Sequence, residues 1–188
     1  MQTELDLIQN YLKESREIHS ASGLLFIPDI SGFTEFVSNI CIEAGRFIIC
    51  ELLNTIISSN ILQLQISEVE GDAVLFYKFC SLPNVQDIIY QYEVMLDQFN
   101  IKLKVIENVV GKKFNLSLKL IVHYGKFSEY RIGSFRKLYG EAVVKAHLML
   151  KNDIESNTYI LMSKPVDKII KSSSDEYVMY DYQNYCYK

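Results

Sequence analysis

The sequence has 188 residues, of which 49% are hydrophobic and 22% are charged, a composition typical of a soluble globular domain with a full core. The formal net charge is -4 and the 19 Lys and Arg residues are scattered along the chain, so we expect no binding to DNA or RNA. The acidic start and the absence of an apolar run of about 18 residues argue against a signal peptide and a membrane span. We therefore expect a cytoplasmic protein without nucleic-acid or membrane partners.

A short helix is predicted before the main domain. Apolar residues recur at helical spacing over residues 3–18, and a run of small and polar residues then interrupts the pattern. No linker rich in Gly, Ser or Pro divides the rest of the sequence. We expect an N-terminal helical extension over residues 1–22 and a single domain over residues 23–188.

The main domain begins with a predicted strand, followed by helices and a hairpin. The apolar run Leu24–Ile27 predicts a buried strand that stops at Pro28–Asp29, and Ser31 then opens a helix. Helical periodicity predicts a further helix over residues 43–62. The extended stretch that follows is interrupted at Glu70–Asp72 and then resumes, which predicts a hairpin with a short turn.

The second half of the sequence continues this mixture of strands and helices. A long helix is predicted over residues 83–110, with Pro83 near its first turn. The alternating stretch Leu116–Tyr124 predicts a strand, with residues 130–138 as its hairpin partner across Gly125. The remaining predicted elements are a helix over residues 140–151, strands over 159–162 and 176–182, and a short helix over 165–170. Strands joined both by hairpins and by helices predict an α+β fold, with helices mainly on one face of the sheet.

Two carboxylates are predicted at the rim of this sheet. Asp29 follows an apolar strand at its carboxyl end, and Asp72 lies at the hairpin turn two strands later. Neighbouring carboxylates repel unless a cation lies between them, and their oxygens suit Mg²⁺ or Mn²⁺ better than zinc. The segment Ser31–Thr34 offers free backbone N–H groups at a helix N-terminus, which suits a phosphate. The alternative is that Asp29 and Ser31 only cap a helix and Asp72 only makes a turn.

Four segments resemble motifs of the class III nucleotidyl cyclases, the adenylyl and guanylyl cyclases. Ile27–Thr34 resembles the F-x-D-I-x-G-F-T motif that begins their catalytic domain, and Glu68–Ala73 resembles their K/E-T-x-G-D motif. His123–Gly125 is similar to their H-x-G strand end, and Tyr139–Ala146 is similar to their W-G-D-T-V-N-x-A helix start. The segments follow the family order, so the chain resembles a divergent bacterial-type member. The resemblance implies a ferredoxin-like, cyclase-type fold with a mostly antiparallel central sheet.

The resemblance also implies roles for the residues at the rim. Asp29 and Asp72 would hold two divalent cations, Mg²⁺ or Mn²⁺, with the Ile30 carbonyl as a further ligand. These ions would activate the ribose 3′-hydroxyl and stabilise the departing pyrophosphate. The triphosphate would bind the backbone of the loop formed by Ser31, Gly32, Phe33 and Thr34.

The two positions that select the base in this family are Glu68 and Lys137 in this sequence. Adenylyl cyclases carry Lys and Asp at these positions and guanylyl cyclases carry Glu and Cys, so the chain half agrees with the guanylyl pattern. Glu68 could accept from the guanine N1–H and amino group, and Lys137 could donate to O6. The alternative is a Glu68–Lys137 salt bridge that only fills an unused pocket.

The last long helix departs from the family pattern. Val144 replaces an asparagine that orients the ribose, and Leu148 replaces an arginine that neutralises charge on the phosphate. Loss of one such donor costs on the order of 10²–10³ in rate. Lys151 lies on the same helix face and could reach back as a substitute. Its alternative role is that of a solvated cation at a helix end.

Three hypotheses about function follow from the resemblance. The leading one is a divergent class III cyclase-like domain that binds a nucleoside triphosphate, guanine preferred, with a divalent metal, and has degenerate catalytic machinery. Because the family works as head-to-tail dimers, the resemblance also implies a homodimer. One alternative is an active nucleotidyl cyclase that forms cyclic nucleotide and pyrophosphate with unusual transition-state residues. The other alternative is a dimeric interaction module that binds no nucleotide.

Overall fold

The computed structural model describes residues 3–4, 8, 19–163, 166 and 177–181. The helices predicted over residues 3–18 and 165–170 lie almost wholly outside these ranges. Among the described residues, no helix is both long enough and apolar enough to cross a membrane.

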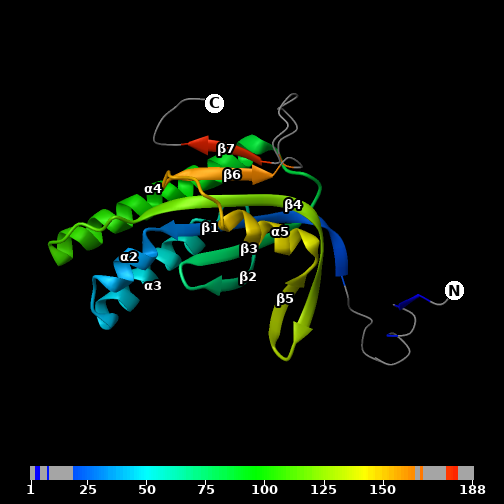
Figure 1. The fold of residues 1–188 in the computed structure, drawn as a ribbon, viewed down its shortest axis with the longest axis horizontal. Coiled ribbons are helices and arrows are strands. Elements are labelled where there is room, and N and C mark those ends of the chain that lie inside the picture. Colours follow the sequence, from blue (N-terminus) through cyan, green and yellow to red (C-terminus); the bar gives the residue numbers. More distant parts are fainter. Residues whose placement is uncertain (1–2, 5–7, 9–18, 164–165, 167–176, 182–188) are drawn as a thin grey trace.

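Seven strands form a single sheet within the described ranges (Figure 1). They are β1 His19–Ser31, β2 Gln65–Glu70, β3 Ala73–Phe79, β4 Ser117–Ile132, β5 Phe135–Tyr139, β6 Tyr159–Ser163 and β7 Tyr177–Asp181. Their order across the sheet is β2-β3-β1-β4-β6-β7, and β5 pairs with β4 beside this path. Every neighbouring pair is antiparallel except β4 and β6, so the predicted mostly antiparallel sheet is confirmed.

The helices in the described part of the chain cover the two faces of the sheet unequally. They are α2 Phe33–Ser38, α3 Ile42–Ser58, α4 Val85–Val110 and α5 Glu141–Leu150. Helices α3 and α4 pack on one face, where Phe26, Leu52 and Phe99 are completely buried. Helix α5 packs on the other face, against Leu25 and Ile27. Burial of each such side chain contributes about 1.5–3 kcal/mol, and the prediction that helices lie mainly on one face is confirmed.

Strand β1 continues past Pro28 and Asp29, so the prediction that it stops there is wrong. Asp29 pairs with both β3 and β4, and the strand runs on to Ser31. The N–H of Ile30 donates to the Asp72 carbonyl (3.0 Å), and the nitrogen of Pro28, two residues earlier, faces the same side. Pro28 therefore removes one hydrogen bond toward β3 and none toward β4, which explains why a central strand tolerates it.

The hairpin turn predicted at Gly125 is also wrong. Strand β4 runs through Gly125 without a break, and the turn into β5 is made later, at Gly133 (φ 58°). A Cβ added at Gly125 would lie 2.9 Å from the Cβ of Ala142 in α5. This glycine therefore permits close packing of α5 on the sheet, and the β4–β5 hairpin projects from the rest of the sheet (Figure 1).

Candidate functional site

A row of four residues, three of them charged, crosses the sheet on the face that carries α5. Glu70 of β2 pairs with Ala73 of β3, Ala73 pairs with Asp29 of β1, and Asp29 pairs with Lys119 of β4. Residues directly opposite one another on neighbouring strands share a face. Because Ile27, two residues before Asp29, packs against α5, the whole row lies on the α5 side.

The structure brings Asp29 and Asp72 together. Asp72 lies in the turn just before β3, and the Ile30 N–H donates to its backbone carbonyl at 3.0 Å. Burial raises the pKa of Asp29 to about 6; the Lys119 ammonium lowers it and the Asp72 charge raises it further. Burial also raises the pKa of Asp72. Two partly buried carboxylates thus repel each other at the place where the sequence predicts a cation.

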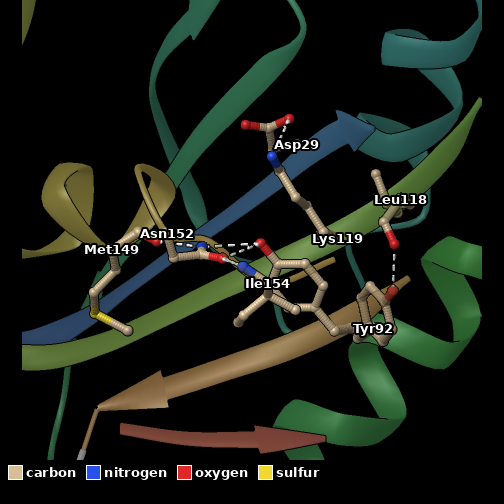
Figure 2. A network of polar contacts seen from close by, with 8 residues as sticks. Asp29, Tyr92, Leu118, Lys119, Met149, Asn152 and Ile154 are labelled. Carbon is tan, nitrogen blue, oxygen red and sulfur yellow. Dashed lines mark hydrogen bonds and ion pairs between the residues drawn. The ribbon is translucent and has the colours of Figure 1, made fainter. Parts of the chain in front are cut away.

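Lys119 completes this cluster, and sequence reasoning did not identify it. Its Nζ lies 3.6 Å from Asp29 Oδ1, and the two side chains are 22% and 14% exposed. Figure 2 shows Lys119 extending from β4 toward Asp29. A lysine between Leu118 and Leu120 on a buried strand is the signal that could have revealed it, because a cation at such a position needs a partner.

The neighbouring backbone of β4 is anchored from the other side of the sheet. Tyr92 of α4 is completely buried, and its hydroxyl donates to the Leu118 carbonyl (Figure 2). This bond joins α4 to β4 one residue before Lys119. The ammonium of Lys119 therefore extends from a segment that is held between the sheet and α4.

The cluster has the donor set of a divalent-cation site. Lys119 offsets only one of the two carboxylate charges, and oxygen ligands are those that Mg²⁺ and Mn²⁺ prefer. The Ile30 carbonyl lies on the side of β1 that its own N–H faces, which is the side of Asp72. The residues present fit a hard divalent cation held by Asp29 and Asp72.

The predicted phosphate loop lies at the end of β1 and the start of α2. Gly32 precedes the helix with φ 84°, and no side chain caps the helix, so the alternative in which Asp29 or Ser31 caps it does not hold. A Cβ on Gly32 would lie 2.1 Å from the Asn115 carbonyl oxygen. Gly32 is therefore required by the contact with Asn115, while the N–H groups of Phe33 and Thr34 have no partner inside the helix.

The structure also joins Glu68 and Lys137, the predicted base-selecting pair. Lys137 Nζ of β5 donates to Glu68 Oε2 of β2. This bond is the main cause of the raised pKa of Lys137. The Glu68 side chain is 21% exposed and that of Lys137 is 38% exposed, so both are partly exposed to solvent. The salt bridge named in the alternative is therefore present.

Helix α5 carries the two apolar residues that stand where the family pattern has asparagine and arginine. Val144 and Leu148 are 59% and 58% exposed, and their spacing places them on one face of the helix. Lys151 follows the last residue of α5, and its backbone N–H donates to the Leu148 carbonyl at 3.0 Å. The surface at Val144 and Leu148 is therefore apolar.

One family model matches more than half of the chain. A family model described as "Protein of unknown function (DUF2652)" matches residues 49–159. No curated protein matches the chain significantly.

Solved structures share the fold at low sequence identity. The adenylyl cyclase CyaB from P. aeruginosa is 19% identical, with a TM-score of 0.68, and the match covers 80% of both chains. The guanylate cyclase domain of RhGC from Catenaria anguillulae, in complex with GTP, is 19% identical, with a TM-score of 0.63 over 81% of this chain and 84% of that chain. A class III adenylyl cyclase-like ATP-binding protein from Pseudomonas aeruginosa is 15% identical, with a TM-score of 0.65 over 78% of this chain and 34% of that chain. The predicted cyclase-type fold is confirmed.

Proposed function

The chain belongs to the DUF2652 family of proteins of unknown function, and we propose that it binds a nucleoside triphosphate, guanine preferred, together with Mg²⁺ or Mn²⁺. In this proposal it is a divergent class III cyclase-like domain whose catalytic machinery is degenerate. The cluster of Asp29, Asp72 and Lys119 is the main support, because it combines two carboxylates for a cation with an ammonium for phosphate oxygens.

The cation and the triphosphate have separate partners in this cluster. Asp29 and Asp72 would hold the cation, with the Ile30 carbonyl as a further ligand, and the bound ion would neutralise charge on the phosphates. The backbone N–H groups of the Ser31–Thr34 loop would bind phosphate oxygens. Lys119 would turn from Asp29 to the triphosphate, so that each charge in the cluster keeps a partner.

Guanine selection would come from Glu68 and Lys137. The carboxylate of Glu68 can accept from N1–H and the exocyclic amine of guanine, and the Lys137 ammonium can donate to O6. In the orientation that suits guanine, adenine would place its N1 acceptor at Glu68 and its amine donor at Lys137, so the pair opposes adenine in that orientation. In the absence of a base the two side chains satisfy each other, as their hydrogen bond indicates.

Catalytic degeneracy is supported by the exposed apolar pair on α5. Val144 and Leu148 offer no side-chain donor to a ribose or to a phosphate in the transition state. An interaction made only in the transition state contributes to rate and not to ground-state affinity. The class III adenylyl cyclase-like ATP-binding protein from Pseudomonas aeruginosa supports a binding role on this fold, although ATP carries adenine and not guanine. Lys151, as a substitute cation, is the basis of the alternative in which the chain is an active cyclase.

We propose a homodimer on the basis of two apolar surfaces. A groove of about 540 Å³ lies between α2, α3 and β2, and its walls include Phe33, Val37, Ile49, Leu53 and Val69. The projecting β4–β5 hairpin carries exposed Ile132 and Phe135 (59% and 69%). Exposed apolar surfaces of this kind mark association sites, and a hairpin from a second copy could fill the groove.

Titration of GTP into the purified chain with Mn²⁺ tests the proposed function. Binding that requires Asp72 supports it. Absence of binding by any nucleoside triphosphate favours the alternative of a dimeric interaction module.

A further inference from the structure

Three side chains outside the Asp29 cluster converge between β2 and α5. One carboxylate oxygen of Glu68, one of Glu70 and one ring nitrogen of His147 all lie within 4.8 Å of one another. Glu68 and Glu70 pair with Leu75 and Ala73 of β3, which pack in the cluster that includes α5. The two glutamates therefore project from the α5 face of the sheet, where α5 presents His147.

We propose that Glu68, Glu70 and His147 form a transition-metal site, distinct from the Asp29 and Asp72 pair, that takes Zn²⁺ or a similar borderline ion. An imidazole nitrogen with two carboxylate oxygens suits Zn²⁺ or Co²⁺, whereas Mg²⁺ prefers oxygen ligands alone. With three protein ligands the ion keeps an open coordination position, as in exchangeable zinc sites and unlike closed structural ones.

The side chains need only a small movement to bind an ion. Zinc lies about 2.0–2.2 Å from nitrogen and carboxylate ligands, so the ligand atoms must approach one another from their present separations of up to 4.8 Å. Glu70 is exposed and Glu68 and His147 are partly exposed, so no packed core resists this movement. The site lies at the surface, where an ion can enter.

The Lys137 ammonium competes with a metal ion for Glu68. Its ammonium donates to Glu68 Oε2, and the charges of Glu68 and Glu70 both raise its pKa. Two carboxylates and one ammonium leave a net negative charge that attracts a cation. A bound metal would displace the Lys137 side chain into solvent. Because Glu68 is also the proposed guanine acceptor, the metal would oppose guanine binding, a consequence that rests on the proposed function.

Calorimetric titration of the full chain with Zn²⁺, without nucleotide, tests the site independently of nucleotide binding. We expect one zinc equivalent whose affinity falls at least about tenfold in His147→Ala and in Glu70→Gln, since even indirect ligand-shell losses cost 10–100-fold. Lys137→Met should bind zinc more tightly, because it frees Glu68. His19→Ala is the matched control, since His19 is an exposed histidine on β1, and it should bind as the wild type does.

A Co²⁺ absorption spectrum identifies the ligands of the same site. The site predicts d–d bands without a thiolate charge-transfer band, and these bands should be lost in His147→Ala. A thiolate band, unchanged zinc affinity in both His147→Ala and Glu70→Gln, or no zinc binding by the wild type would overturn the assignment. Unchanged thermal unfolding of the metal-free variants shows that they are folded.

Discussion

Lys119 on β4 lies directly opposite Asp29 on β1, and its ammonium nitrogen is 3.6 Å from the Asp29 carboxylate. This pairing follows from sheet register, because the two residues are partners across central strands. Lys119 lowers the pKa of Asp29, but burial dominates and holds it at about 6. The carboxylate is thus kept in a costly position that its neighbour only partly compensates, which is typical of functional sites.

The first prediction concerns stability as a function of pH in the presence of a chelator. The pKa of Asp29 is about 6 in the folded chain against the ordinary 3.8, so between these values the folded chain holds a proton that the unfolded chain has released. The free energy of unfolding should therefore fall as pH rises through this range. Asp29→Asn should remove this loss and raise the free energy of unfolding at pH 7 by up to about 3 kcal/mol.

Urea denaturation at pH 4, 5, 6 and 7 measures this effect. The matched control is Asp97→Asn, at an exposed position on α4, which should retain the wild-type pH dependence. An Asp29→Asn protein that is less stable than the wild type at pH 7 would contradict the assigned cost of the buried carboxylate.

The second prediction concerns the choice of base. GTP with Mn²⁺ should raise the melting temperature more than ATP does, because Glu68 and Lys137 match the donors and acceptors of guanine. Glu68→Gln should reduce the difference between the melting-temperature shifts of the two nucleotides. The neutral amide lacks the negative charge that strengthens the two hydrogen bonds from guanine. Thermal-shift measurements at matched nucleotide concentrations provide the comparison. Equal shifts for GTP and ATP in the wild type would remove the base-selection argument.

The third prediction concerns turnover. With Mn²⁺ and each common nucleoside triphosphate the wild type should form little or no cyclic nucleotide, because Val144 and Leu148 supply no transition-state donor. Val144→Asn combined with Leu148→Arg should raise whatever rate exists, by on the order of 10²-fold or more if both donors reach their targets. Chromatographic assay of cyclic nucleotide measures both. Robust wild-type turnover that Asp72→Ala abolishes would show that the machinery is not degenerate and would direct attention to Lys151.

The fourth prediction concerns the homodimer. Phe135→Asp at the hairpin should shift a dimer to monomers, because a charge would enter the apolar groove of the second copy. Val109→Asp on α4 serves as the control, since Val109 is exposed but lies on neither proposed surface. Analytical ultracentrifugation separates the two states. A wild type that stays monomeric at high concentration, or a Phe135→Asp protein that remains dimeric, would contradict the proposed interface.

Local patterns in the sequence predict most of the described elements, because most of them bury an apolar face. The apolar positions of α3 and α4 recur at helical spacing, and the hairpin of β2 and β3 is marked by Gly71 (φ 60°). Local patterns mislead where tertiary contacts decide. Strand β1 continues through Pro28 because its pairing with β4 is intact. Gly125 lies within β4, where it permits the close approach of α5 and makes no turn.

The residues of the candidate site also divide into those that the sequence predicts and those that depend on tertiary contacts. Asp29 and Asp72 were predicted from their places at a strand end and a hairpin turn, and then from motif resemblance. Glu68 and Lys137 were predicted from the resemblance alone, which assigns positions along the chain. Lys119 and His147 were missed as partners because their meeting with Asp29 and Glu68 depends on strand register and on the placement of α5. Such pairings join residues far apart in sequence, and no local periodicity encodes them.

Isothermal titration of GTP in the presence of Mn²⁺, comparing the wild type with Asp72→Asn, tests nucleotide and metal binding most directly. Asp72 is partly exposed in the turn just before β3, and burial raises its pKa, so the substitution should leave the fold intact while removing a cation ligand. We predict saturable binding by the wild type that is weakened at least about tenfold by Asp72→Asn and is lost for both proteins in chelator. Equal GTP affinity in the wild type and in Asp72→Asn, or no heat of binding with any nucleoside triphosphate, would contradict a metal-dependent nucleotide-binding domain.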